Sequence, residues 1–170
     1  MKTLIYRITL LFAGVALFTA CNDKSNNPEP ALTNCTNCQL LFTERADLVI
    51  PGYNFTSGDY RIFWSETQKN VITQRLYIKA PMQGTSFTLT KADIVAGKII
   101  VLDNCPNCNL FAMHPVDGSV KGVNTTPGAR ADKAKWLIEA KIIRQPFDNT
   151  FGYRDTVYIK QYFGANFVLD

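Results

Sequence analysis

Residue types that carry catalysis or hold nucleic acid are scarce in this sequence. Its 170 residues include one histidine, His114, and no Gly-x-Ser-x-Gly, phosphate-loop, dinucleotide-binding or His-Glu-x-x-His motif. Lys and Arg number 18 against 14 Asp and Glu, a net charge of +4, without a basic run that would neutralise a nucleic-acid backbone. We therefore expect a protein that is not an enzyme and binds no nucleic acid, with His114 half-buried at a strand end.

The sequence also lacks the features of disulfide-dense small domains and of fibrous chains. Five cysteines are few for a chain of 170 residues, and 46% hydrophobic with 19% charged residues is typical of a folded soluble domain. The length suits a single domain that builds its own core.

No apolar run is long enough to cross a membrane as a helix. The longest, residues 8–18, has about 11 residues against the roughly 20 that a bilayer requires. The basic residues Lys2 and Arg7 precede it, and the small residues Thr19 and Ala20 follow it. This order is typical of a signal peptide, so we expect residues 1–20 to be removed on export.

Phe18-Thr19-Ala20-Cys21 resembles the lipobox of bacterial lipoproteins, although Phe18 stands where that family commonly has Leu. The resemblance covers the first 21 residues and implies that Cys21 is lipidated, with palmitate among its acyl chains, and becomes the first mature residue. More than one acyl chain anchors a protein stably, so the membrane is an expected partner. In that family, Asp directly after the lipidated cysteine tends to retain the protein in the inner membrane. Asn22 occupies this position here, so the resemblance implies the outer membrane, on either its periplasmic or its cell-surface face. An ordinary signal peptide followed by a chance cysteine is the alternative.

Residues 21–33 and 34–170 differ in pattern. The first segment is polar, contains Pro28 and Pro30 and has no apolar period, so we expect a lipid-anchored flexible tether. In the second segment apolar and polar residues alternate over short spans bounded by Gly, Pro, Asn and Asp, as in strands with one buried face. Residues 34–170 are therefore predicted to form a single β-rich domain.

Three segments decide the details of this β domain. Residues 98–102 are almost all apolar, which predicts a central strand covered on both faces. Residues 129–144 have a helical composition but a period-two apolar pattern, and we favour a strand. Residues 91–97 suit one helical turn. In all we expect about seven or eight strands in an antiparallel β-sandwich or, as the second choice, a partly open barrel.

The strongest signal in the mature chain is a repeated cysteine turn. Asn-Cys-x-Asn-Cys-polar-Leu occurs once with Cys35 and Cys38 and again with Cys105 and Cys108. Two residues between cysteines let both sulfurs face one side of a tight turn, and Asn tolerates the left-handed backbone that such a turn often needs. Both turns are similar to zinc knuckles, although the Gly that usually follows the second cysteine is missing. If the turns meet, four thiolates would hold one structural zinc ion.

Oxidation is the alternative, because disulfides persist in exported proteins and four cysteines are an even number. All three pairings are open. A disulfide across the turns closes about 70 residues and stabilises by roughly 4.4 kcal/mol, against roughly 1.9 kcal/mol for a pair within one turn. In either form we expect the cysteines to act as one structural staple.

The function expected from the sequence is that of a lipid-anchored envelope protein with a β-rich binding or structural domain. Two alternatives stay open. An envelope thiol-redox protein would use one Cys-x-x-Cys pair with a lowered cysteine pKa. A module that binds a glycan or a peptide of a protein partner would carry a contiguous exposed aromatic patch.

Overall fold

The computed structural model describes residues 31–35 and 37–168. The expected signal peptide, the lipidated Cys21 and most of the expected tether lie outside the described residues. Thr33, at the end of the expected tether, is hydrogen-bonded to the domain: its backbone N–H donates to the Lys160 carbonyl at 3.0 Å, and the side chain of Gln161 donates to the Thr33 carbonyl. The ordered contacts of the domain therefore begin at or before Thr33.

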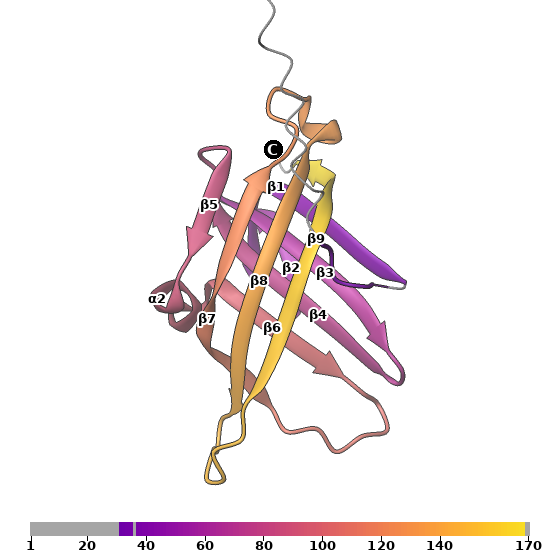
Figure 1. The fold of residues 1–170 in the computed structure, drawn as a ribbon, viewed down its shortest axis with the longest axis vertical. Helices are drawn as coiled ribbons and strands as arrows, with labels where there is room; N and C mark the ends of the chain where they lie inside the picture. Colours follow the sequence, from indigo (N-terminus) through magenta and orange to yellow (C-terminus); the bar gives the residue numbers. More distant parts are fainter. Residues whose placement is uncertain (1–30, 36, 169–170) are drawn as a thin grey trace, which may run out of the picture. The chain divides into compact units, whose positions relative to one another are not determined.

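The described residues form nine strands with three short helical segments (Figure 1). The strands are β1 (Cys38–Val49), β2 (Asn54–Ser57), β3 (Tyr60–Lys69), β4 (Ile72–Pro81), β5 (Ser86–Leu89), β6 (Ile99–Asn104), β7 (Met113–Asn124), β8 (Lys135–Pro146) and β9 (Asp155–Val168). The helical segments are α2 (Lys91–Asp93), η1 (Ile94–Lys98) and η2 (Ala131–Lys133). No helix in the part of the chain that the structure describes is long and apolar enough to span a membrane.

All strands belong to a single curled sheet in the order β5-β7-β8-β9-β1-β3-β4-β6, with β2 paired to β1. The all-β prediction is confirmed, and the partly open barrel, our second choice, describes the fold because there is one sheet rather than two. Neighbouring strands are antiparallel except β1 and β9, which run parallel. The sheet ends at β5 and β6. Because β5 pairs only with residues 120–123 of β7, the first half of β7 has no partner strand on that side and lies next to β6. The half-barrel is therefore open along the seam between β6 and β7 (Figure 1).

The inner face of the curled sheet carries the main core. On β8 every second residue from Trp136 to Ile142 is buried, which confirms a strand with the period-two pattern over most of residues 129–144. The first part of that segment is not strand, because residues 131–133 form η2. The largest fully buried rings are those of Phe42, Phe63, Trp136 and Phe163. They come from four different strands and pack with ring centroids 5.6–5.8 Å apart where they meet at Phe63.

The outer face has a smaller apolar cluster beneath the β1–β2 hairpin. Tyr53 and Phe55 from this hairpin lie over Tyr77 of β4, with centroid distances of 5.8 and 6.4 Å. Ile100 and Leu102 of β6 pack against the same cluster. Residues 98–102 are thus covered on both faces as predicted, but the predicted central position is wrong, because β6 is an edge strand. Apolar residues on both faces reflect this second cluster rather than a place in the middle of the sheet.

The expected helical turn at residues 91–97 is present. The backbone N–H of Thr90 donates to the Asp93 carboxylate at 2.8 Å, and Lys98 donates to the same carboxylate at 2.7 Å. Gly97 has φ of 81°, a left-handed conformation that favours glycine and turns the chain into β6. The hydrogen bond from Lys98 and then that from Thr90 lower the pKa of Asp93 to about 2.

Candidate functional site

Two long loops emerge at the same end of the half-barrel, which we call the loop end. The β6–β7 loop covers residues 105–112 and the β8–β9 loop covers residues 147–154 (Figure 1). β6 leads into this end and β7 leaves it, while β8 leads in and β9 leaves. Because β7 and β8 are adjacent and antiparallel, the two loops start from neighbouring positions of the sheet.

Five large apolar side chains on these two loops are exposed, and we call them the apolar rim. They are Leu110, Phe111, Phe147, Phe151 and Tyr153. Phe111 is 79% exposed and Phe151 is 97% exposed. Large apolar side chains that gather on one exposed surface mark a site of interaction, whereas scattered ones need no explanation.

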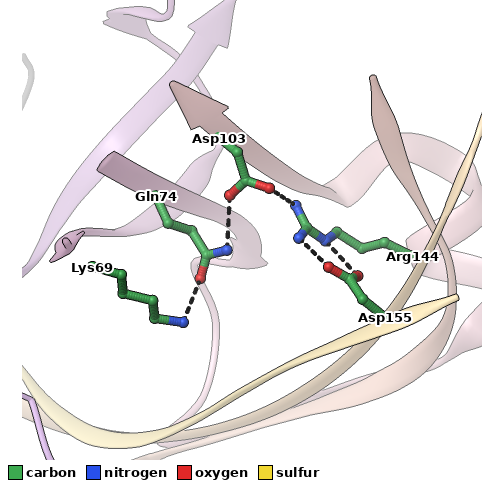
Figure 2. A network of polar contacts seen from close by, with 5 residues as sticks. All are labelled: Lys69, Gln74, Asp103, Arg144 and Asp155. Atoms are coloured by element: carbon green, nitrogen blue, oxygen red, sulfur yellow. Dashed lines mark hydrogen bonds and ion pairs between the residues drawn. The ribbon is translucent and has the colours of Figure 1, made fainter. Parts of the chain in front are cut away.

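Behind the rim, the inner face of the sheet ends in a network of charged and polar side chains, which we call the polar belt. Its members are Lys69 of β3, Gln74 of β4, Asp103 of β6, Arg144 of β8 and Asp155 of β9. Figure 2 shows that they form one continuous chain of contacts. Each side chain lies at the loop end of a different strand, on the same face as the core, so the belt caps the apolar interior.

Arg144 is the centre of the polar belt. Its Nε and one Nη donate to the two carboxylate oxygens of Asp155 at 2.9 and 2.5 Å, and the other Nη donates to Asp103 at 2.7 Å. The second oxygen of Asp103 accepts from Gln74 at 2.8 Å, and the Gln74 carbonyl accepts from Lys69 at 3.3 Å. The guanidinium is thus fixed in place on both sides.

Burial and hydrogen bonding act in opposite directions on this arginine. The Arg144 side chain is only 4% exposed. Burial lowers its pKa, but hydrogen bonds to Asp155 and Asp103 raise it by more in sum, so the net shift is upward and the guanidinium stays charged. The two carboxylates remain partly accessible, 20% exposed for Asp103 and 29% for Asp155. With Lys69 included, the belt carries two positive and two negative charges and is locally neutral.

The first of two hollows at the loop end has a volume of about 470 Å³, and we call it the belt hollow. All five polar belt residues line it on one side. Apolar side chains complete its wall: Ile72, Leu110, Phe111, Met113 and Tyr153. Apolar walls with a few fixed polar groups are typical of small-molecule sites.

The second hollow, about 370 Å³, follows the open seam of the half-barrel, and we call it the seam hollow. Five consecutive residues of β6, 99–103, form one wall, and residues 111–115 form the other. Phe147, Tyr53 and Arg144 also line it. The two hollows adjoin, because Asp103, Phe111, Met113 and Arg144 line both.

His114 faces the seam hollow and is half-buried near the start of β7, as the sequence predicted. Its ring stacks on Phe147 with a centroid distance of 4.4 Å. Its Nδ1 is buried and has no hydrogen-bond partner among the described residues. The stack connects the start of β7 to the β8–β9 loop.

The four cysteines of the predicted staple form two separate disulfides, Cys35–Cys38 and Cys105–Cys108, with Cα atoms 5.9 and 5.3 Å apart. Asn37 has φ of 56°, the left-handed conformation predicted for an asparagine in such a turn. The Cys108 N–H donates to the Cys105 carbonyl at 3.2 Å. Each turn is thus closed on itself.

Strand register explains why the disulfides do not cross between the turns. Cys38 of β1 is opposite Thr67 of β3, and Gln74 of β4 is opposite Asp103 of β6, so two strands lie between the turns. At about 4.8 Å per strand the turns are roughly 14 Å apart, beyond the ~7 Å limit on Cα atoms joined by a disulfide. Within the described residues no three His, Cys, Asp or Glu side chains form a group that could hold a metal ion. The four-cysteine zinc site stays a prediction, which would require reduction of both disulfides and movement of the turns.

None of the polar belt residues was identified from the sequence, because they lie on five strands and share no motif. One signal was available. The buried face of β8 continues beyond Ile142 to Arg144, and an arginine on a core face indicates a paired buried charge. The chain matches no protein-family model, and no curated protein and no solved structure is similar enough to it to count as a match.

Proposed function

We propose that this chain is a lipid-anchored protein of the bacterial outer membrane whose β domain binds a glycan at the loop end. The observation that carries the glycan proposal is the apolar rim around a fixed, locally neutral polar belt. Neutral charge favours neither an anion nor a cation. Sugars present flat C–H faces that pack on aromatic rings, and hydroxyl groups that both donate and accept hydrogen bonds.

The donors and acceptors of the polar belt suit such a ligand. Asp103 and Asp155 have exposed carboxylate edges that accept hydrogen bonds from hydroxyl groups. Lys69 is exposed and donates, and Gln74 has an amide that does both. Since Arg144 holds both carboxylates in position, little conformational entropy is lost when a ligand binds.

The same contacts favour binding over glycoside hydrolysis. Hydrolysis by two carboxyl groups requires one of them to be a protonated donor to the leaving oxygen. Here all four carboxylate oxygens of Asp103 and Asp155 already accept a hydrogen bond from Arg144 or Gln74, so none of them is placed to donate a proton to a leaving oxygen. The arrangement therefore supports a binding module.

Thiol-redox chemistry, the alternative from a different class, has weaker support. A reactive Cys-x-x-Cys pair lies at the N-terminus of a helix that lowers the pKa of its first cysteine. Among the described residues, Cys38 begins strand β1, and Cys105–Cys108 is followed by a loop without a helix.

Affinity electrophoresis tests the glycan proposal. The purified soluble domain is run in native gels that contain xylan, mixed-linkage β-glucan, mannan or mucin glycans. At least one polysaccharide should retard the domain, and Phe111→Ala should weaken that retardation about tenfold or more, as expected for an aromatic side chain at the centre of an interface. Tyr158→Ala is the matched control, because Tyr158 is an exposed aromatic residue of β9 that is outside the rim and lines neither hollow. No retardation by any glycan, or equal retardation of F111A, contradicts the proposal.

The membrane anchor is tested separately. Cys21 is the only cysteine that can accept the lipid under the lipobox resemblance, so Cys21→Ala should move the protein from the membrane to the soluble fraction and abolish incorporation of labelled palmitate. Membrane association that survives C21A contradicts the anchor and leaves the glycan proposal intact.

A further inference from the structure

We propose that the glycan is recognised as a chain of at least two sugar units that spans the belt hollow and the seam hollow together. This inference rests on the proposed function and names the form of the ligand. It assigns the two hollows as adjoining subsites with Phe111 between them.

The shared wall is the first observation. Asp103, Phe111, Met113 and Arg144 line both hollows, so a ligand in one is next to a ligand in the other. Phe111 is 79% exposed, and its ring offers surface to both sides. Two separate small-molecule sites would have walls of their own.

Each hollow also has an exposed aromatic residue that the other lacks. Tyr153 lines only the belt hollow, and Phe147 lines only the seam hollow. Both are exposed, at 55% and 75%. Tyr153 therefore belongs to the belt hollow, Phe147 to the seam hollow and Phe111 to both. Successive sugar units of a chain require such a series of rings.

The hydrogen-bonding groups that line the belt hollow also differ from those that line the seam hollow. The belt hollow offers Lys69, Gln74 and both carboxylates. The seam hollow offers Asp103 together with the edge of β6, which pairs only with β4 among the described strands. Backbone N–H and C=O groups along a free edge are strong hydrogen-bonding groups that a ligand can satisfy.

Occupation of both subsites by one chain makes the second contact intramolecular. The affinity then exceeds that of a single unit without any further contact. We expect the association constant to rise about tenfold or more from the monosaccharide to the di- or trisaccharide, and to change little for longer chains.

The test is calorimetric titration of the soluble domain with the xylo-, cello-, manno- and chito-oligosaccharide ladders, each from one to six units. In Tyr153→Ala and in Phe147→Ala the ratio of trisaccharide to monosaccharide affinity should fall towards one, because either change leaves only one working subsite. In Phe111→Ala both affinities should fall. Tyr158→Ala, an exposed aromatic residue of β9 that is outside the rim and lines neither hollow, should keep the ratio of the unchanged protein.

The outcomes separate this inference from the proposed function. Binding with equal affinity for one and three units, or a ratio that survives either Y153A or F147A, overturns the two-subsite arrangement while glycan binding stands. Failure of all four ladders to bind the unchanged domain, together with no retardation in the polysaccharide gels, overturns both. Circular dichroism and urea unfolding of each variant show that the fold is retained.

Discussion

Two arginines, Arg61 and Arg144, lie on the inner face of the sheet at opposite ends of the same core, and their surroundings differ in kind. Arg61 pairs with Glu44 at 2.8 Å, donates to the Met82 carbonyl at 3.2 Å and lies over the Trp136 ring at 4.3 Å. Arg144 contacts two carboxylates and, within the part of the chain that the structure describes, does not lie over an aromatic ring. Trp136 and Arg144 are eight residues apart on β8, so the two ends are separated by about 26 Å.

The comparison indicates what each end does. One carboxylate and two carbonyls neutralise and satisfy Arg61, and a ring covers its guanidinium. A hollow of about 480 Å³ lies at this end too, beside residues 130–132, but neither Arg61 nor Glu44 lines it. The loop end has a second carboxylate, exposed carboxylate edges and two hollows under an apolar rim. A fully satisfied buried charge is structural, whereas a rigid charged group with accessible partners can present those partners to a ligand.

The largest expected effect comes from removing the arginine at the loop end. Arg144→Met leaves Asp103 and Asp155 without their counter-charge, and we expect a loss of about 3–5 kcal/mol in the free energy of unfolding. The loss should be smaller for Arg61→Met, which leaves one unpaired carboxylate, Glu44, rather than two. Urea denaturation measures both. Asp155→Asn in the R144M background should recover part of the loss, because one unpaired charge disappears. A smaller loss for R144M than for R61M contradicts the comparison.

The two disulfides allow a second comparison within the loop end. Both lie at this end, but only Cys105–Cys108 is in the loop whose next residues line the hollows. Replacing both cysteines of either pair by Ser should cost about 1.9 kcal/mol, the chain-entropy value for a four-residue loop. Loss of Cys105–Cys108 should in addition weaken polysaccharide retardation, since this turn anchors the loop that carries Phe111. Loss of Cys35–Cys38 should leave retardation unchanged. Equal effects of the two on retardation would show that the β6–β7 loop has no special role.

The ion pair of Asp93 with Lys98 is more exposed than those of Arg61 and Arg144, and we expect it to contribute less to the free energy of unfolding. The pKa of Asp93 is lowered to about 2, so the stability from its bonds to Lys98 and Thr90 is complete above about pH 4 and is lost as the pH falls towards 2. Asp93→Asn should cost about 1 kcal/mol at pH 6, as for loss of a helix cap, and almost nothing at pH 2. Unfolding free energies measured between these pH values test this. A difference between D93N and the unchanged protein that is independent of pH contradicts the assignment.

The smallest effect is expected at the tip of the rim. Phe151 is 97% exposed, so Phe151→Ala should change the free energy of unfolding by less than about 0.5 kcal/mol. Thermal unfolding is sufficient to measure this. A larger loss would mean that the β8–β9 loop packs against a surface that its exposure does not reveal.

The sequence predicted the architecture better than the site, for a physical reason. Alternation on β8 and its neighbours is a local signal, and it was enough to predict an all-β domain and a strand within residues 129–144, where β8 begins at Lys135. The apolar pattern of residues 98–102 correctly indicates burial on both faces of the strand. It does not indicate which strands are neighbours, so the prediction of a central strand was wrong. The polar belt depends on the register of five strands, which no local pattern contains.

The cysteine turns show the same limit. Their spacing predicted a tight turn in each copy, and Asn37 has the expected left-handed backbone. Whether the two turns meet depends on the strands between them. β3 and β4 separate the turns, and each pair closes on itself.

The most direct measurement of the central claim is a chemical-shift titration of the isotopically labelled domain with the oligosaccharide that binds most tightly. We predict that the largest shifts occur at the loop end, at Asp103, Phe111, Met113 and the Nε–H of Arg144. The opposite end, around Arg61 and residues 130–132, should be unaffected. Shifts concentrated at the opposite end, with the loop end unchanged, would contradict the assignment of the loop end as the binding site.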